Sequence, residues 1–350
     1  MATDGPVGAE VGAAGAERHP VTARQLARVL GISQSTVSRA FSPGGTVAPA
    51  MRARVLEAAA RLGYQPNAIA RSLSTRRSGI VGIVMATMTN PFYPEVLEHL
   101  SRRLHEADLR TLLFNVPPGQ ELDSELPLLL RYQVDAVVIA SATISSAMAR
   151  EWAATGRAAV LFNRTVPGAK VASVSCDNEA GGRAVADFLV ARGHRCPAFV
   201  AGRRDTSTNL DRERGFLARL QDLGVPLHAR VDGGEYSYEA GFAAALELAG
   251  QRPDAIFFAN DIMALGGMDA LRHRLRLCVP EDVSVVGFDD IPMAAWPSYG
   301  LTTVQQPVQR MIEETVRILV EAGRGGEATQ VHLLPGCLIE RGSTRGRAAA

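Results

Sequence analysis

The sequence predicts an α/β protein with a small helical head, a short hinge helix and a larger body of two doubly wound lobes. Between Thr22 and Gly63, three helical patterns with clear start and end signals follow one another. From Gly79 onward, apolar strand-like runs alternate with amphipathic helices, which is typical of a parallel sheet covered on both faces. At 350 residues the chain exceeds one typical domain, so it is long enough for both parts.

The first two helices of the head are predicted to form a helix-turn-helix. Thr22 makes a capping box with the glutamine three residues later and starts a helix over about residues 23–30, with apolar residues at helical spacing: Leu26, Val29 and Leu30. Gly31 supplies the positive φ of a tight turn. Ser33 then caps a second helix to about Phe41, which turns three residues inward: Ile32, Val37 and Ala40.

A third helix completes the head. Pro49 suits the first turn of a helix, and Gly63 is a good residue to end one. Three of its residues face inward: Met51, Val55 and Ala59. We expect the three helices to close one small apolar core.

The head carries a concentrated positive charge. Between Arg18 and Ser78 there are ten arginines and a single acid, Glu57, for a local charge of +9 in a chain of formal net charge +1. The remainder therefore carries −8. Such a distribution is typical of a polyanion-binding module, although a basic solvated surface has the same charge count.

The outer side of the second helix carries short hydrogen-bonding groups and one guanidinium, which are suited to reading base edges in the major groove of DNA: Gln34, Ser35, Thr36, Ser38 and Arg39. At this point the chain resembles the lactose/galactose repressor family. The resemblance rests on Val21-Thr22, on the run GISQSTVSRA over 31–40 and on RLGYQPNAIARSL over 61–73. It extends more loosely from Val21 to about Arg345.

This resemblance implies a sequence-specific, DNA-binding transcriptional repressor. Its expected parts are a disordered tail over 1–19, a helix-turn-helix DNA-binding domain over 20–66, a hinge helix and linker over 67–78, a two-lobed ligand-binding and dimerisation domain over 79–345, and a tail over 346–350. Carried over by position, Gln34, Ser35 and Arg39 would contact base edges, with Arg39 on a guanine. Thr22, Ser33, Thr36 and Ser38 would hold phosphates or helix ends, and for Ser33 capping is the larger role.

The segment after Pro66 is predicted to be a hinge helix. Asn67 is a good cap for residues 68–74, which are too few to form a stable helix in water alone. In the family, two such helices pair across a dimer in the minor groove, which implies DNA contacts by Asn67, Ala70, Arg71 and Leu73. Leu73 would be the wedge that opens the central base step; the alternative is that it packs on Ile69.

Seven strands are predicted in the body: Ile80 to Ala86, Thr111 to Asn115, Ala136 to Ile139, Ala159 to Phe162, Ala198 to Ala201, Ala255 to Phe258 and Val283 to Phe288. The segment Ser173 to Asn178 is predicted to cross between two lobes. The resemblance implies two lobes of the periplasmic sugar-binding-protein type (type I), with a small ligand in the cleft between them.

The side chains that bind the ligand are expected on loops at the carboxyl ends of strands. Arg212 and Asp289 match the family's ligand-gripping arginine and aspartate, and an aromatic wall is implied at Phe92, Tyr93 and Tyr236, to which Trp296 would add. Two further polar side chains complete the predicted site: Thr208 and Asn260. Phe92 has the alternative role of core residue, and Asp261 is interpreted as a helix cap rather than a ligand contact.

The ligand class is only partly defined by the sequence. Related purine repressors have an arginine where this chain has Thr206, which argues weakly against a purine. A sugar, sugar acid or similar polar metabolite is the better interpretation, since an arginine also serves a carboxylate. Whether the ligand acts as an inducer or a corepressor, and which operator and genes are regulated, the sequence leaves open.

Two other classes of protein fit the sequence less well. An enzyme is disfavoured because the chain has no G-x-G-x-x-G loop after the first strand, no Walker lysine loop, no G-x-S-x-G elbow and no paired metal-binding histidines. The same observations predict no cofactor and no metal. An extracytoplasmic sugar-binding protein would need a signal peptide and would have no use for the head.

The expected partners are double-stranded palindromic operator DNA, a small-molecule effector and a second copy of the chain. Two reading helices one helical turn apart require a symmetric homodimer. The short carboxyl tail has no leucine heptads, which disfavours a tetramer by that route. The longest apolar run is too short to span a bilayer and the scattered cysteines suit a reducing compartment, so the expected location is cytoplasmic, without a membrane.

Overall fold

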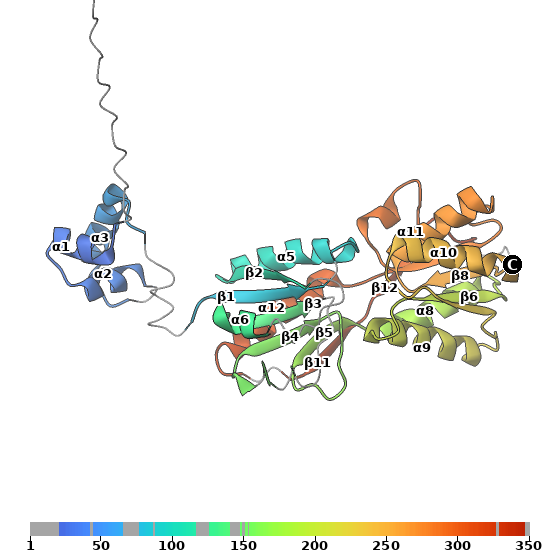
Figure 1. The fold of residues 1–350 in the computed structure, drawn as a ribbon, viewed down its shortest axis with the longest axis horizontal. Coiled ribbons are helices and arrows are strands. Elements are labelled where there is room, and N and C mark those ends of the chain that lie inside the picture. Colours follow the sequence, from blue (N-terminus) through green and yellow to red (C-terminus); the bar gives the residue numbers. More distant parts are fainter. Residues whose placement is uncertain are drawn as a thin grey trace, which may run out of the picture. The chain divides into compact units, whose positions relative to one another are not determined.

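The computed structural model describes residues 21–42, 45–65, 77–86, 88–116, 126–140, 148, 151–152, 154–326 and 329–346. The chain divides into two compact units, Met1–Ser78 and Gly79–Ala350, which are called the head and the body below. Figure 1 shows the helices of the head and the sheets of the body. The predicted amino-terminal tail over 1–19 lies outside the described residues.

The described part of the head contains three helices: α1 (Ala23–Leu30), α2 (Gln34–Phe41) and α3 (Pro49–Leu62). The predicted capping box is present, because Thr22 Oγ1 accepts a hydrogen bond from the Gln25 backbone N–H, and the Thr22 backbone N–H donates to Gln25 Oε1. Gly31 and Gly63 end α1 and α3 in the left-handed conformation, with φ of 66° and 69°. The local end signals therefore placed all three helices correctly.

The three helices enclose a small apolar core: Leu26, Ala27, Val37, Ala40, Val55, Ala58 and Ala59. Val29, which recurs with Leu26 and Leu30 at helical spacing, does not join this core and is 56% exposed. On a helix with 3.6 residues per turn, Val29 lies roughly 100° from the middle of the stripe formed by Leu26, Ala27 and Leu30. Two short neighbouring helices cover only that stripe, so Val29 stays in solvent.

The body contains two six-stranded sheets, both almost entirely parallel. The first has the order β11-β5-β4-β3-β1-β2: Val331–Leu334, Ala172–Cys176, Ala158–Phe162, Ala136–Ala140, Ile80–Met85 and Arg110–Asn115. The second has the order β12-β10-β9-β8-β6-β7: Cys337–Ile339, Thr302–Gln305, Ser284–Asp289, Ala255–Phe258, Pro197–Ala201 and Ala229–Asp232. Among the described strands, β10 and β12 are the one pair that runs antiparallel.

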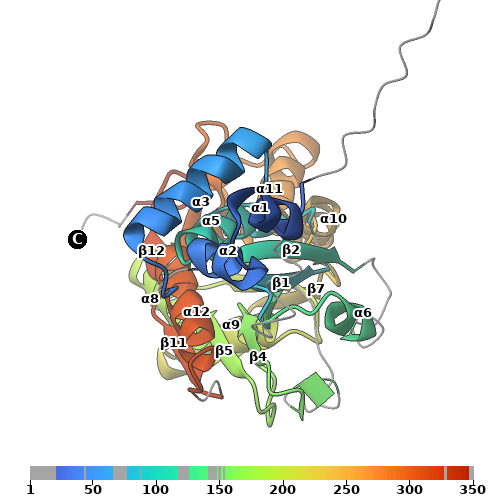
Figure 2. The ribbon, with the colours of Figure 1, turned by 90° about the vertical axis from the view of Figure 1, so that its left-hand side faces the viewer.

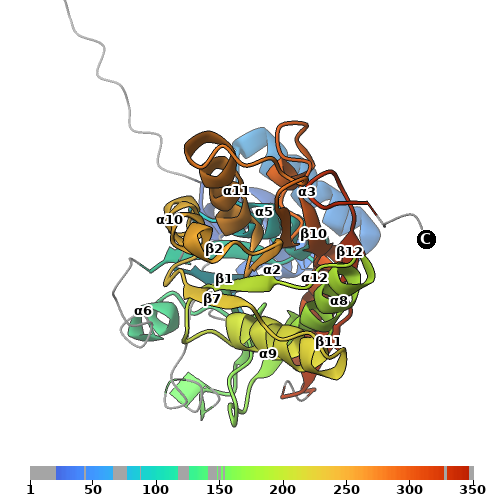
Figure 3. The ribbon, with the colours of Figure 1, turned by 90° about the vertical axis from the view of Figure 1, so that its right-hand side faces the viewer.

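Helices cover both faces of each sheet (Figures 2 and 3). In the first lobe, α5 (Phe92–Glu106) and α12 (Val308–Ala322) pack on one face, while α6 (Leu126–Arg131) packs on the other. In the second lobe, one face carries α8 and α9 and the other carries α10 and α11: Asn178–Ala191, Ser207–Asp222, Tyr238–Leu248 and Asp261–Asp269. The two-lobed, doubly wound architecture is thus as predicted.

Three short helical segments complete the second lobe. They are a 3₁₀ turn at Ala249–Gln251, a π-helical turn at Ala270–Arg274 that continues α11, and a 3₁₀ turn at Pro292–Ala295 after β9. The last of these lies directly beyond the carboxyl end of β9, so it shapes the loop that follows Asp289.

The alternation of side chains along β1 accounts for the two-sided core. Val81, Ile83 and Met85 pack with α5, whereas Val84 faces the opposite cluster with Leu129 of α6. Successive side chains on a strand point to opposite faces, so a strand buried on both faces reads as one continuous apolar run. This explains why β1 was recognisable in the sequence.

The chain crosses between the two sheets three times. It leaves β5 for α8, returns from β10 to α12, and leaves β11 for β12. The predicted crossing at Ser173 to Asn178 needs correction, because most of it is the strand β5 and only its last residues cross. The strand escaped prediction because its alternating serines, Ser173 and Ser175, interrupt the apolar run although both are buried.

None of the described helices is long and apolar enough to cross a membrane. The four cysteines are free thiols. Within the described ranges, no group of three or more histidine, cysteine, aspartate or glutamate side chains is placed to hold a metal ion.

Helices α8 and α9 pack with their backbones in close contact at Gly182 of α8. A Cβ atom on Gly182 would overlap the carbonyl oxygen of Arg212 and lie 2.9 Å from the backbone nitrogen of Phe216. Backbone atoms cannot move aside as a flexible side chain can, so the helices would have to separate. This contact fixes the position of Arg212, which is described below.

We therefore expect Gly182→Ala to lower the free energy of unfolding by about 1–3 kcal/mol, because overpacking outweighs the gain in helix propensity. Urea denaturation of the full-length protein measures the change. Gly250→Ala is the matched control, since a Cβ atom there meets nothing within 4 Å. Equal stability of the two variants would contradict the close-packing argument.

Asp261 is a fully buried carboxylate in the second lobe. It accepts hydrogen bonds from the Ile291 backbone at 2.9 Å and from Thr303 Oγ1 at 2.6 Å, so it joins α11 to β10 and to the loop after β9. Burial, reinforced by the charge of Asp289, raises the pKa of Asp261 to about 7. Because the folded form holds its proton more tightly than the unfolded form, ionisation opposes folding.

Between about pH 4 and pH 7 the unfolded chain loses this proton while the folded protein keeps it, so stability falls as the pH rises. We expect Asp261→Asn to remove this contribution, which is at most ~1.4 kcal/mol per pH unit. Urea denaturation at several pH values gives the slope. The exposed Asp108→Asn serves as control, and a slope unchanged in Asp261→Asn would be inconsistent with the raised pKa.

Candidate functional site

Helix α2 presents its polar side to solvent. Gln34, Ser35, Ser38 and Arg39 are all exposed. The guanidinium of Arg39 lies back along its own helix, with Nε donating to the Ser35 carbonyl at 3.3 Å and Nη2 to Thr36 Oγ1 at 3.4 Å. These exposed bonds are weak and local, so the guanidinium is accessible from outside and its donors are available to an acceptor such as a guanine edge.

The hydroxyl groups at the start of α2 form a local cluster. Ser33 caps the helix by accepting from the Thr36 backbone, and its Oγ lies 2.8 Å from both Ser35 Oγ and Thr36 Oγ1. Thr22 plays the corresponding part at α1. Capping is therefore a structural role of Thr22 and Ser33, while their exposure leaves the predicted phosphate contacts as predictions.

Two arginines of the head hold the fold together. Arg52 donates from Nη2 to the carbonyls of Ser42 and Gly45, at 3.2 and 3.1 Å, and so ties α3 to the chain that follows α2. Arg54 donates to the Leu30 carbonyl at 3.4 Å. Charge counting alone cannot separate such arginines from those free to meet phosphates. The predicted hinge contacts, Asn67, Ala70, Arg71 and Leu73, lie outside the described residues.

In the body, the second lobe is organised around a buried ion pair at the carboxyl end of its sheet. Arg212 Nη2 donates to Asp289 Oδ1 at 3.1 Å, and both side chains are almost completely buried. Nε donates to Asn178 Oδ1 at 2.8 Å, and Nη1 donates to the Ala259 carbonyl at 2.6 Å. The guanidinium also lies 3.7 Å from the centre of the Phe288 ring. Every nitrogen of Arg212 is thus engaged within the protein.

Asp289 ends β9 in a strained conformation. Its φ is 123° and that of Asp290 is 59°, both in the left-handed region that non-glycine residues rarely adopt. Asp289 Oδ1 also accepts from Gln306 Nε2 at 2.7 Å, whereas its Oδ2 forms no hydrogen bond to a described residue. Burial raises the pKa of Asp289, and the nearby Arg212 guanidinium offsets part of that rise.

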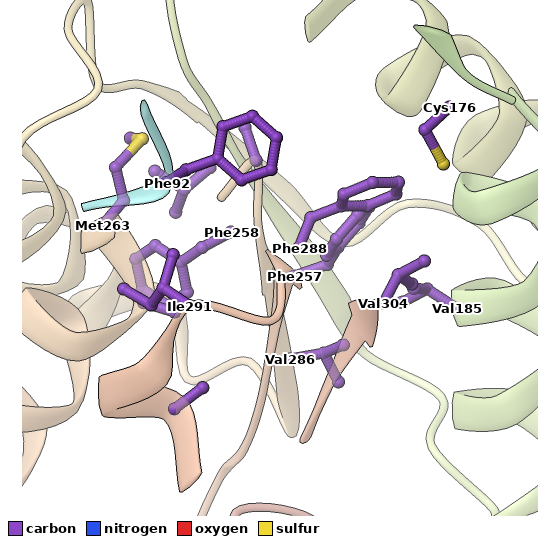
Figure 4. Close-up of a cluster of buried hydrophobic side chains, with 14 of the residues drawn as sticks. Phe92, Cys176, Val185, Phe257, Phe258, Met263, Val286, Phe288, Ile291 and Val304 are labelled. Atoms are coloured by element: carbon purple, nitrogen blue, oxygen red, sulfur yellow. The ribbon is translucent and has the colours of Figure 1, made fainter. Parts of the chain in front are cut away.

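Phe92 and Tyr93 begin helix α5 of the first lobe and are both buried, at 3% and 6% exposure. Figure 4 shows Phe92 in one apolar cluster with Met263, Phe258 and Ile291 of the second lobe. Phe92 therefore packs in the core between the lobes, while its predicted contact with a ligand stays a prediction. The electrostatic influence of Asp289 and of Tyr236 on the pKa of Tyr93 places its hydroxyl near the second lobe.

Tyr236 reaches the start of α9. Its hydroxyl lies 3.0 Å from Thr206 Oγ1 and 3.2 Å from Thr208 Oγ1. The ring lies directly on Gly202, where a Cβ atom would overlap it, so glycine is required at the end of β6. Trp296, which was expected to extend the aromatic wall, is 54% exposed and caps the 3₁₀ turn after β9.

Asn260 is the N-cap of α11, with Oδ1 accepting from the Met263 backbone at 3.2 Å. The cap was assigned to Asp261, and this is wrong by one residue: the chain leaves β8 fully extended at Asn260 before the helix begins. Asn260 Nδ2 is buried without a hydrogen-bond partner. Such an orphaned donor in a native protein calls for water or a ligand.

Sequence reasoning missed three buried residues of this region: Asn163, Arg164 and Gln306. Each has at least one buried polar atom without a partner. Asn163 and Arg164 directly follow the predicted strand that ends at Phe162, so the rule about carboxyl ends of strands would have found them. Gln306 follows β10, whose Thr-Thr-Val-Gln sequence carries no strand signal by itself.

Two family models match the chain. The one described as bacterial regulatory proteins, lacI family, covers residues 22–67, and the one described as periplasmic binding protein-like domain covers 186–344. The HTH-type transcriptional regulator CelR of Thermobifida fusca is 32% identical over 327 residues, which are 91% of this chain and 96% of CelR.

Two solved structures extend this likeness to the fold. A lac repressor dimer bound to operator and the anti-inducer ONPF has a TM-score of 0.85 at 26% identity, covering 94% of this chain and 100% of that one. A CelR–cellobiose complex has a TM-score of 0.70 at 29% identity, covering 92% and 99%. The relatives are DNA-binding regulators and not enzymes. This chain therefore belongs to the lacI family of bacterial regulatory proteins and is a DNA-binding transcriptional regulator.

Proposed function

We propose that the protein is a cytoplasmic, homodimeric repressor that binds a palindromic operator and whose operator affinity is controlled by a sugar or sugar-acid metabolite held between the two lobes of the body. The observation that carries this proposal is the buried polar set at the carboxyl end of the second sheet. Asp289 Oδ2 and Asn260 Nδ2 lack protein partners within the described chain, although both residues are buried. A hydroxyl-rich ligand supplies such partners.

In this proposal, Arg212 positions Asp289. Three of its five N–H donors are used within the protein, and the second hydrogens of Nη1 and Nη2 stay available to the ligand. The free oxygen of Asp289 then accepts from a ligand hydroxyl. Phe92 contributes apolar contact between the lobes rather than a ligand surface.

We infer that α2 reads the operator, with Arg39 at a base edge, and that Asn67, Ala70, Arg71 and Leu73 of the hinge contact the minor groove. The operator-bound dimer of the lac repressor supports the dimer. Two reading helices related by a twofold axis call for a palindromic site. The sugar class is supported by the cellobiose complex of CelR. The effector shifts operator affinity to the extent that it binds two states of the body unequally, and the three interlobe crossings are the elements that such a change would bend.

Arg39→Met tests the reading helix. We expect about ten- to a hundredfold weaker binding to an operator selected from a random duplex library, because a good bidentate contact is worth ~1–3 kcal/mol of discrimination. Binding to unrelated DNA should change little. Fluorescence anisotropy over a range of salt concentrations measures both.

The matched control is Arg28→Met, an exposed arginine in the last turn of α1. It removes one charge of the basic head without touching the reading helix, so any loss of affinity should be the same for operator and unrelated DNA. If Arg39→Met weakens both duplexes to the same degree, Arg39 does not read sequence.

Asp289→Asn tests the effector site. Its amide oxygen keeps an acceptor for Arg212, but the charge is lost, and we expect effector affinity to fall at least about tenfold, since a hydrogen bond to a charged group is worth ~1.5–3 kcal/mol. Isothermal titration calorimetry with the sugar or sugar acid that best stabilises the wild type measures this loss. Operator affinity without effector should be retained.

Asp290→Asn is the matched control. Its carboxylate is turned toward Arg341 Nη2 at 2.7 Å and Gln305 Nε2 at 2.8 Å, away from the Arg212 pair. It should bind effector like the wild type. Normal effector affinity in Asp289→Asn would disprove the proposed site.

A further inference from the structure

We propose that the second lobe holds a second ligand site, a cavity that binds an apolar α-amino acid as its zwitterion. The cavity lies at the amino edge of the second sheet, beside Asp254, directly before β8, and Val283, directly before β9. Asp289 ends β9 at the opposite edge of the sheet, about 20 Å away at the rise of a strand. The inference therefore goes beyond the proposed function, because its site is separate from the one between the lobes.

The cavity has a volume of about 490 Å³ and an apolar wall. It lies between α10, the 3₁₀ turn that follows α10 and the π-helical turn that continues α11. Buried apolar side chains form its floor: Ala245, Leu248, Ile256, Leu271 and Val283. Half-buried apolar side chains line its sides: Ala249, Pro253, Leu275 and Leu277. Binding sites for small molecules commonly have this volume and an apolar wall with a few polar groups.

The π-helical turn is an irregular part of this wall. The Leu275 backbone N–H donates to the Ala270 carbonyl at 3.0 Å, which is the hydrogen bond between residues five apart that defines such a turn. Leu271 lies inside the turn and Leu275 ends it, and both line the cavity. Single π-helical turns are rare and occur frequently at functional sites. The backbone that shapes the cavity is therefore of a kind that proteins often use to build a site.

Opposite charges lie at the mouth of the cavity. Arg252 is exposed, with a φ of 52°, and its guanidinium forms no ion pair or hydrogen bond within the described chain. Asp282 is also exposed, and its Oδ2 accepts from the Cys278 backbone N–H at 2.6 Å, while its Oδ1 has no partner among the described residues. Asp254 uses both of its oxygens to accept backbone N–H groups, at 2.7 and 3.1 Å. One cation and one carboxylate oxygen are thus available to a ligand.

An apolar amino acid complements the floor and both charges. Its carboxylate matches the guanidinium of Arg252, its ammonium matches the free oxygen of Asp282, and its side chain covers the apolar wall. An apolar acid without the ammonium would bring a second anion close to Asp282, and an apolar amine would bring a second cation close to Arg252. A polar amino acid would leave the apolar wall in contact with water. The apolar zwitterion therefore fits the cavity better than any of these three.

Thermal unfolding of the full-length protein tests this choice with matched probes, because binding to the native state raises the midpoint by mass action. L-leucine is compared with isocaproate, isoamylamine and L-serine, and L-phenylalanine with hydrocinnamate, phenethylamine and L-serine. Each comparison removes the ammonium, the carboxylate or the apolar side chain in turn. We expect leucine or phenylalanine to raise the midpoint, and the incomplete probes to bind at least about tenfold more weakly in titration calorimetry.

Arg252→Gln and Asp282→Asn test the two charges at the mouth. Each keeps a polar side chain, and the asparagine still offers an oxygen to the Cys278 backbone. We expect each variant to bind the amino acid about five- to tenfold more weakly, because hydrogen bonds to a charged group at an exposed rim lie at the low end of their range. The matched controls are Arg276→Gln, exposed with a φ of 58°, and the exposed Glu281→Gln, neither of which belongs to the cavity wall. Both controls should bind like the wild type.

The inference fails if an incomplete probe binds as tightly as the amino acid, if neither charge variant weakens binding, or if neither amino acid raises the midpoint. Asp289→Asn separates the two sites, since it should bind the amino acid as the wild type does. Loss of amino-acid binding in Asp289→Asn, with normal binding in Arg252→Gln, would place the ligand between the lobes and overturn the second site. The proposed function is judged by the sugar and sugar-acid titrations alone.

Discussion

The second lobe depends on the buried pair of Arg212 and Asp289. This pair joins α9 to the end of β9, and the other nitrogens of Arg212 reach Asn178 at the start of α8 and the Ala259 carbonyl after β8. Four elements are thus fixed by one side chain. Removing one partner of such a pair leaves a buried charge uncompensated and typically costs about 3–5 kcal/mol. The glycine contact between α8 and α9 allows the guanidinium to sit this deep.

The two sides of the interlobe site differ for that reason. On the second lobe, the ion pair and Gln306 hold Asp289 in a conformation that its own backbone disfavours, so this half is built before any ligand arrives. On the first lobe, Asn163 and Arg164 keep buried polar atoms without partners. One lobe therefore offers a preorganised acceptor, and the other offers groups that remain to be satisfied.

The sequence predicted what is local and missed what depends on distant neighbours. The helices of the head follow from capping residues such as Thr22 and Ser33, whose hydrogen bonds span three residues. The central strands follow from their apolar runs. The edge strands β11 and β12 contain no fully buried residue, so they carry no apolar run, and they form because β5 and β10 pair with them. Asp289, which pairs with Arg212, lies 77 positions away along the chain. The sequence alone therefore did not show that Arg212 is already hydrogen-bonded within the protein.

The asymmetry between the lobes also explains how a small ligand can move the body. Buried donors and acceptors must be satisfied by something, and water satisfies those of each lobe independently. A ligand that bonds Asp289 with one group and the unpartnered polar atoms of the first lobe with another satisfies both lobes only when they are close together. It therefore binds the closed arrangement more tightly than an open one, and differential affinity of this kind is what shifts a conformational equilibrium. Because β5, β10 and β11 all lead across the same boundary, any change in closure bends all three crossings together.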